Sequence, residues 1–305
     1  MIKYLARRFV ASALILLGVV TITFCLIYIF PADPVRQVAG HNATPETVAS
    51  IRHEMGLDRP LPERYAIYVG RLFQGDLGRS YIQKSDVGEL IRSRLPATLL
   101  LMLGAIFFEL LIGIPLGILA AARRGKVDRG IMIMAFAGVS APQFVVGLIL
   151  LYVFAYVIGW FPLSGYGSIS HLILPALTLG IGGGGWYARV LRSNLVEVMR
   201  QDYIRTARAK GLGERSVVMI HALRNAILPA VAMVGLDIGT FMGGAVVVES
   251  VYGWPGIGQL AWQAIQRVDS PIIMGVTLVA AVAIVIGNLL ADLVTPLIDP
   301  RVRLR

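Results

Sequence analysis

Long apolar runs separated by short polar segments dominate the chain. Each run is long enough, as a helix, to cross about 30 Å of hydrocarbon. The runs cover approximately residues 9–30, 97–121, 131–158, 172–191, 227–248 and 272–294. They lack the alternation of apolar and polar residues that barrel strands show, and in lipid the backbone groups must be satisfied within each segment. The pattern predicts an all-α, polytopic membrane protein with six transmembrane helices.

The first run resembles a secretory signal in one respect, because Lys3, Arg7 and Arg8 precede it. The apolar stretch is longer than a usual signal core, and the sequence "FPADPV" after it offers no small-residue cleavage site. We therefore expect residues 1–30 to form a short N-terminal segment and a retained first transmembrane helix.

The segment between the first two runs, residues 31–96, is polar enough to fold outside the bilayer on the periplasmic or extracellular side. The pattern around Thr44 predicts a short helix that ends near Gly56, and "RYAIYVGRLFQG" has apolar residues at helical spacing. His41 and His53 have no neighbours at metal-ligand spacing, so we expect surface histidines and no metal site.

Composition agrees with a membrane protein, since 56% of the residues are hydrophobic, 15% are charged and the mean hydropathy is +0.73. Basic residues concentrate in the loops before the third and fifth runs and at the C-terminus, namely Arg123, Arg124, Lys126, Arg129, the stretch from Arg189 to Arg224, Arg301, Arg303 and Arg305. The connection 159–171 has no charged residue, and in 251–271 Arg267 is balanced by Asp269.

This asymmetry places the basic loops and both chain termini in the cytoplasm, because short cytoplasmic loops carry the excess of lysine and arginine. The protein is expected in the bacterial inner (plasma) membrane as a multi-pass chain. Its net charge of +10 is explained by this bias and by anionic lipid of the inner leaflet, so nucleic acid is not expected as a partner.

Three acidic residues, Glu109, Asp237 and Asp292, lie within the apolar runs, where an unpaired charge is costly. They either form hydrogen bonds between helices, with a partner such as Asn288 or a second subunit, or line a polar passage. A proton relay is disfavoured because the three do not form a series on one helix.

The glycine-rich sequence "GIGGGGWYAR" lacks the Lys-Ser/Thr of a phosphate-binding loop, so it predicts neither ATP binding nor another cofactor. Gly180 and Gly184 are instead placed to let two helices approach closely.

The basic stretch "DYIRTARAKGLGERSVVMIHALRNAILP" lies within the loop 192–226 and its exit. One helix is expected to stop at Gly211 and a second to start at Glu214, before Pro229 opens the fifth run. A DNA-binding role is excluded because both ends are tied to the bilayer. Such a helix pair suits docking into a groove of a partner protein. The candidate docking residues are Asp202, Tyr203, Arg205, Thr206, Ala207, Arg208, Lys210, Gly211, Glu214, Arg215, His221, Arg224, Asn225 and Pro229.

At this stretch the chain resembles the permease subunits of bacterial ABC importers. Arg205, Thr206 and Ala207 occupy the positions of the Glu-Ala-Ala signature ahead of Gly211, and Leu228-Pro229 comes later than in the general consensus. This variant is similar to the first, B-type permease of dipeptide and oligopeptide importers. Further similar motifs are "MIKYLARR", "FPADPVR", "MGLDRPLPERY", "GDLGRSY", "RLPATLLL", "SAPQFVVGLILL", "ILPALTLG", "VVESVYGWPGIGQL" and "DPRVR".

The resemblance implies a type I permease bundle whose core is residues 97–305, with the helix pair of loop 192–226 coupled to cytoplasmic ATPases. It also implies a heterodimer with a second, C-type permease, two ATP-binding subunits and an extracytoplasmic solute-binding protein. The chain itself is then not an enzyme. Short peptides are the expected substrate, with glutathione, nickel complexes or other small solutes as alternatives. An ion-coupled secondary carrier is the competing class, and it lacks a clear inverted repeat.

Overall fold

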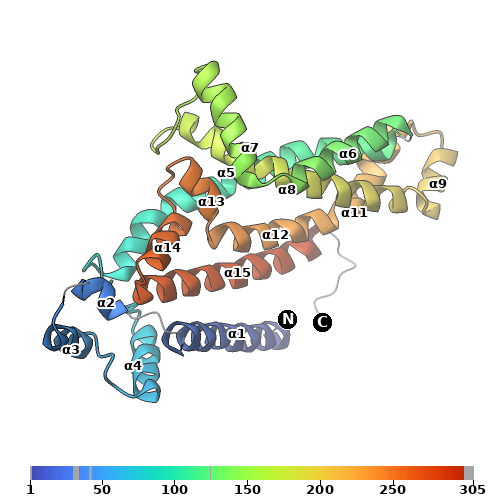
Figure 1. Cartoon of the computed structure of the whole chain (residues 1–305). Coiled ribbons are helices and arrows are strands. Elements are labelled where there is room, and N and C mark those ends of the chain that lie inside the picture. The colour runs from blue at the N-terminus through green and yellow to red at the C-terminus, as the bar shows by residue number, and fades with distance from the viewer. Residues whose placement is uncertain (1, 30–33, 41–42, 124, 299–305) are drawn as a thin grey trace.

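The computed structural model describes residues 2–29, 34–40, 43–123 and 125–298 (Figure 1). The first half contains α1 (Ile2–Ile29), α2 (Pro34–Ala39), α3 (Pro45–Glu54), α4 (Leu61–Phe73), α5 (Val87–Ala122), α6 (Lys126–Ser140), α7 (Gln143–Leu150) and the π-helical η1 (Leu151–Val157). The second half contains α8 (Ile169–Val198), α9 (Asp202–Ala209), α10 (Glu214–Ser216), the π-helical η2 (Val217–Ala222), α11 (Leu223–Ala226), α12 (Leu228–Met242), α13 (Val246–Val251), α14 (Ile257–Gln266) and α15 (Ser270–Ile298). The all-α class expected from the sequence is confirmed.

Three helices of the described chain, α1, α5 and α15, are long and apolar enough to cross a membrane. Two bent helix pairs raise the number to as many as five if each pair is one span. The remaining predicted span coincides with α8, which is not among them. Glycines lower its hydropathy between positions 180 and 185, and it packs between α5 and α6.

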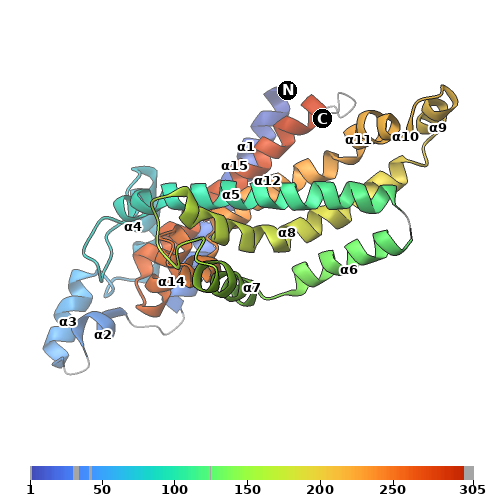
Figure 2. The same ribbon diagram turned by 90° about the horizontal axis from the view of Figure 1, so that it is seen from above.

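The long helices pack side by side in the order α6, α8, α5, α12, α15 and α1 (Figures 1 and 2). The most extensive contact joins α5 and α8. A Cβ atom on Gly180 would lie 2.3 Å from Cβ of Phe108, and one on Gly184 would lie 3.0 Å from Cβ of Ile112. The predicted close approach at Gly180 and Gly184 is therefore confirmed, and the missing side chains are what permit it.

Two of the predicted spans are not continuous helices. The run 131–158 breaks at Pro142, where α6 and α7 bend by 101°. Proline lacks a backbone N–H and restricts the residue before it, so the helix ends there. The run 227–248 ends at Met242, because Gly244 has a φ of 95° and starts a turn into α13.

The outer segment follows the sequence expectations. Thr44 caps α3, with its Oγ1 accepting a hydrogen bond from the Thr47 backbone N–H at 3.3 Å. The amphipathic sequence forms α4. His53 contacts Asp58 through Nδ1 and Oδ2 at 2.7 Å, and the described residues contain no cluster able to hold a metal ion. His41 lies outside the described residues.

A buried aspartate attaches this segment to the helical core. The Oδ2 atom of Asp269 accepts a hydrogen bond from Ser80 Oγ at 2.5 Å. The backbone N–H groups of Tyr81 and Ile82 also donate to the Asp269 carboxylate, each at 3.2 Å. Asp269 is only 1% exposed, so these hydrogen bonds fix the loop after α4 on the turn between α14 and α15.

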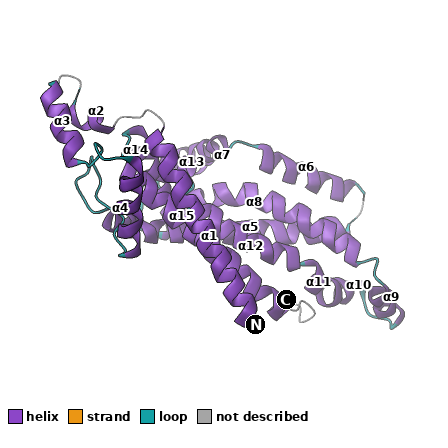
Figure 3. Ribbon diagram, turned by 90° about the horizontal axis from the view of Figure 1, so that it is seen from below, coloured by secondary structure: helices purple, strands orange, loops and turns teal. Residues whose placement is uncertain are grey.

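The loop formed by α9, α10, η2 and α11 lies at the end of the molecule opposite to α2 and α3 (Figures 1, 2 and 3). The start of α1 and the end of α15 lie toward the α9 side. The helices α5 and α8 lie along the long axis of the molecule (Figures 1 and 2).

Candidate functional site: a docking loop and a buried acidic centre

The loop between α8 and α12 contains the helix pair expected from the sequence. The first helix, α9, ends at Ala209, and Gly211 follows with a φ of 78°. The second begins at Glu214 and continues through η2 and α11. The positive φ is the conformation that glycine adopts without steric cost, so Gly211 is the residue that reverses the chain.

One face of the pair is buried against the long helices. Ile204 and Ala207 of α9 are 0% and 7% exposed, and they pack with Val217 of η2. The same apolar cluster contains Leu191 and Leu195 at the end of α8. Side chains of α5 border it, at Ile114, Ile118 and Ala121. The helix pair is thereby joined through packed side chains to α5 and α8, the two helices with the most extensive contact.

Two side-chain contacts hold the helices of the pair together. Arg208 donates from Nη2 to Glu214 Oε1 at 2.7 Å and from Nε to Oε2 at 3.1 Å. Asn225 Nδ2 donates to the Tyr203 hydroxyl at 2.7 Å. The Arg208–Glu214 pair is solvent-exposed, so it orients the turn more than it stabilises the protein.

The other face of the pair is open. Tyr203, Leu212, Met219 and Ile220 expose 42%, 39%, 47% and 63% of their surface. Exposed basic side chains lie in the same loop, at Arg205, Lys210, Arg215 and Arg224. An exposed surface that combines large apolar side chains with arginine is typical of protein-binding sites.

The remaining predicted loop residues have local roles. Asp202 accepts hydrogen bonds from Thr206 Oγ1 at 3.0 Å and from Arg205 Nη1 at 3.4 Å. His221 is half-buried in η2, and Pro229 lies in the first turn of α12. Proline fits there because the first turn has no intrahelical partner for its missing N–H.

A second polar site lies inside the bundle, where α5, α8 and α12 meet. Glu109 of α5 is 2% exposed, and its side chain interacts electrostatically with that of Asp237 on α12. The hydroxyl of Tyr187, on α8, donates to Asp237 Oδ2. Two acidic side chains buried at one site repel each other when both are ionised, which disfavours two negative charges there.

Gly183 provides the space for the Glu109 carboxyl group. A Cβ atom at this position would lie 1.7 Å from Glu109 Oε1. The other oxygen, Oε2, is buried and has no hydrogen-bond partner in the described structure. This centre therefore brings polar side chains of α5, α8 and α12 together inside the bundle, with one buried oxygen left without a partner.

We expect Glu109→Gln to leave the stability of the protein nearly unchanged, because the glutamine amide can donate a hydrogen bond to Asp237. Glu109→Leu should destabilise the protein by about 1–3 kcal/mol, because leucine leaves Asp237 without a buried polar partner. The measurement is the unfolding midpoint of the purified protein in detergent. Equal midpoints for the two variants would show that the carboxyl pair does not join the helices.

The sequence anticipated two members of this centre but not the third. Tyr187 was missed because a tyrosine in a glycine-rich run gives no signal of its own. Asn288 is half-buried on α15, and no hydrogen bond joins it to Glu109 or Asp237, so the suggested amide partner is replaced by a carboxyl pair and a tyrosine. The side chain of Asp292 lies outside the described residues.

A further buried acid, Glu249 on α13, was also missed. It is 0% exposed, and its Oε2 accepts a hydrogen bond from the Gln259 backbone N–H at 2.6 Å. Gly256 leaves room for it, since a Cβ atom there would lie 2.2 Å from Glu249 Oε1. The carboxylate therefore caps the N-terminus of α14, where the helix dipole favours a negative group.

These features define a class of protein. The chain is a polytopic helical membrane protein that presents an exposed, membrane-tethered docking loop joined by packed side chains to its longest helices. This combination is typical of a membrane permease subunit that is driven by partner proteins.

The family models agree with this class. The model described as "Binding-protein-dependent transport system inner membrane component" matches residues 113–304, and the model of the N-terminal part of such components matches residues 1–102. The chain belongs to this family, and it is a permease subunit of an ATP-binding-cassette importer.

The similar proteins are full-length relatives. The oligopeptide transport system permease AppB of Bacillus subtilis (strain 168) is 40% identical over 314 residues, with 99% of each chain covered. The glutathione transport system permease GsiC of Salmonella choleraesuis (strain SC-B67) is 38% identical, and so is the di/tripeptide transport system permease DppB of Pseudomonas aeruginosa (strain UCBPP-PA14); each match covers 99% of both chains.

Among solved structures, a chain of the MetNI methionine ABC transporter in an inward-facing conformation is similar in fold. The TM-score is 0.57 at 21% sequence identity, with 68% of this chain and 96% of that chain covered. The type I permease bundle expected from the sequence is thereby confirmed.

Membership of the family establishes which subunits of the transporter act together and which of them hydrolyse ATP. A permease of this kind is a multi-pass inner-membrane protein that works with a partner permease, ATPase subunits and a solute-binding protein. ATP is hydrolysed by the separate ATPase subunits, so the chain is not an enzyme.

Proposed function

We propose that this chain forms, as a heterodimer with a second, C-type permease, the passage through which short peptides enter the cell. The observation that carries the proposal is the 40% identity, over 99% of both chains, to an oligopeptide transport permease. Energy reaches the passage from two ATPase subunits, and a solute-binding protein delivers the peptide from outside.

The proposed topology rests on the distribution of basic residues and on the location of the docking loop in the molecule. Residues 1–30 form the N-terminal segment and first span, 31–96 the outer segment and 97–305 the permease core. Both termini and the docking loop face the cytoplasm. Support comes from the clustered basic residues of the loop and from its location opposite α2 and α3 (Figure 2).

The docking loop couples ATP hydrolysis to the passage. Its exposed residues, which include Leu212, Met219 and Ile220 together with arginine and lysine side chains, bind a groove of the ATPase. Its buried face contacts Leu191 and Leu195 of α8, so a movement of the docked pair is transmitted to the bundle. Each ATPase state then favours the permease state to which it binds better.

Glutathione is the second candidate substrate. It is favoured by the 38% identity to a glutathione permease that covers 99% of both chains. Glutathione is itself a tripeptide, so both substrates share an amide backbone and terminal carboxylates.

Reconstitution of the complex tests the function. Proteoliposomes that contain this chain, its cognate permease and both ATPases are expected to accumulate a dipeptide when ATP and the binding protein are supplied. A protonophore should leave uptake unchanged. ATP-independent uptake by this chain alone, abolished by the protonophore, would instead identify an ion-coupled carrier. Competition between the dipeptide and glutathione ranks the two substrates.

A further inference from the structure

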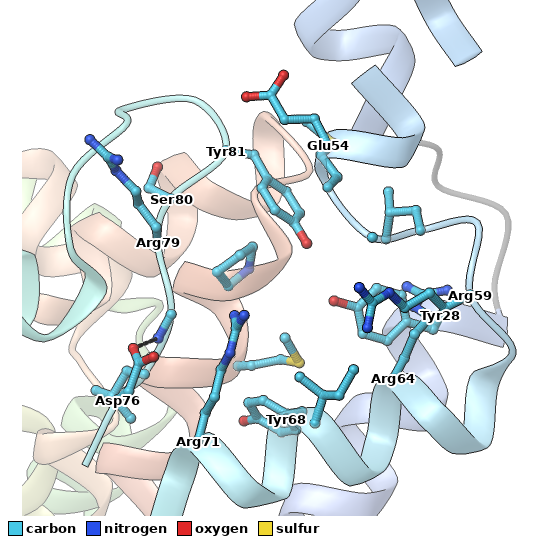
Figure 4. Close-up of a pocket in the computed structure, with 18 of the residues that line it drawn as sticks. Tyr28, Glu54, Arg59, Arg64, Tyr68, Arg71, Asp76, Arg79, Ser80 and Tyr81 are labelled. Atoms are coloured by element: carbon cyan, nitrogen blue, oxygen red, sulfur yellow. Dashed lines mark hydrogen bonds between the residues drawn. The ribbon is translucent and has the colours of Figure 1, made fainter. Parts of the chain in front are cut away.

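A cavity of about 640 Å³ lies between the outer segment and the helical core (Figure 4). Its wall comes from the end of α1, the α3–α4 segment, the loop after α4 and the start of α15. This volume falls within the range of about 300–1,000 Å³ that is typical of small-molecule sites. None of the sites described above includes it.

The lining is aromatic and positively charged. Five basic side chains line the cavity, namely Arg59, Arg64, Arg71, Arg79 and Lys84, against the acidic Glu54 and Asp76. Some of these charges are already engaged. Arg59 Nη1 donates to Glu63 Oε1 at 3.2 Å, and Arg79 Nε donates to the Lys84 carbonyl at 2.7 Å.

Besides the ammonium group of Lys84, the guanidinium groups of Arg64 and Arg71 remain for a ligand. No carboxylate of the described chain forms an ion pair with either of them. The Arg64 guanidinium lies 3.9 Å from the centroid of the Tyr28 ring, and its Nη2 is buried with no hydrogen-bond partner in the described structure. A buried guanidinium nitrogen without an acceptor is costly, and an anion in the cavity would supply the acceptor.

The phenol groups complete the site. Figure 4 shows the guanidinium of Arg71 and the hydroxyl groups of Tyr28 and Tyr81 directed toward the centre of the cavity, whereas the Glu54 carboxylate points away from it. The aromatic faces provide contact area for an apolar group.

We propose that this cavity binds the C-terminal carboxylate of a short peptide, with Arg64 and Arg71 as its ligands and the tyrosine rings around the terminal side chain. This inference rests on the proposed function, which it deepens by naming a peptide-binding position on the outer side of the permease. Arginine suits the role because its planar fork matches both oxygens of a carboxylate. A volume of about 640 Å³ suits a small solute such as a short peptide.

Calorimetric titration of the full-length chain in lipid nanodiscs tests the proposal with alanyl-phenylalanine and its C-terminal amide as probes. The acid is expected to bind, and the amide about tenfold more weakly, because it loses a charge-assisted hydrogen bond. Arg71→Gln should weaken binding of the acid by about tenfold as well. Arg36→Gln is the matched control and should bind normally, since Arg36 is an exposed arginine of the same outer segment that does not line the cavity.

Hydrogen exchange of the unmodified protein gives a second readout that does not depend on the folding of a variant. The dipeptide is expected to protect α4 and residues 76–84. Equal affinity for acid and amide, wild-type affinity of Arg71→Gln, or protection only by the binding protein would each overturn the proposal. ATP-driven dipeptide uptake by the reconstituted complex distinguishes failure of the cavity proposal from failure of the proposed function. If uptake persists although the dipeptide does not bind in the cavity, only the cavity proposal fails. If uptake is absent, the proposed function fails.

Discussion

Gly180→Ala is expected to destabilise the permease by about 1–3 kcal/mol, although it adds only a methyl group. That methyl carbon would lie 2.3 Å from Cβ of Phe108 and 3.2 Å from its carbonyl carbon. The contact involves the backbone of α5, so it cannot be relieved by a rotamer change, and the two helices must move apart. The unfolding midpoint in detergent measures the loss.

Gly182→Ala is the matched control on the same helix. The nearest atom to a Cβ there is the Gly138 carbonyl oxygen at 3.9 Å, an ordinary van der Waals distance. This variant should equal the wild type or exceed it slightly, because alanine is the better helix former. Similar midpoints for the two variants would mean that α5 and α8 are not held at the distance that the structure gives.

Gly211→Val is expected to separate ATP hydrolysis from transport. A β-branched residue at a φ of 78° costs about 1–3 kcal/mol, and the chain relieves this strain by re-aiming the second helix of the docking loop. The spans are unaffected, so the variant should reach the membrane and pair with its partner permease. Uptake should fall by about tenfold or more while the ATPases bind weakly or hydrolyse ATP without moving substrate.

Gly213→Val isolates the backbone effect. Neither Gly211 nor Gly213 has an atom within 4 Å of the position that a Cβ would take, so neither substitution creates a collision. The difference is that Gly213 has a φ of −63°, which valine adopts freely. Normal uptake by both variants, at normal membrane levels, would show that Gly211 is not part of the coupling element.

Both predictions concern one mechanical path. The docking loop packs on Leu191 and Leu195 near the end of α8. In turn, α8 lies close to α5 because Gly180 and Gly184 have no side chains to separate the two helices. Loosening the α5–α8 contact should therefore reduce coupling as well as stability. Uptake by Gly180→Ala, measured per folded molecule, tests this connection.

Much of the protein was determined by local features of the sequence. Apolar run length fixed the positions of the long helices, because a membrane requires long apolar helices. Thr44 marked the start of α3, and Gly211 marked the reversal of the docking loop, since both act within a few residues of themselves. Ala207 was expected among the docking residues, but it is buried with Ile204 against the end of α8, which its position along the chain does not reveal.

Only the tertiary structure decided which residues of different helices face one another. Neither hydropathy nor the presence of proline distinguishes a straight span from one that bends by 101° at Pro142, because Pro115 and Pro175 lie inside helices that continue. Glu109, Asp237 and Tyr187 come from three helices, and no spacing along the chain relates them. The sequence by itself thus determined the helical class, the order of the apolar runs and the docking turn, whereas the polar centre and the outer cavity exist only because distant residues meet when the helices pack.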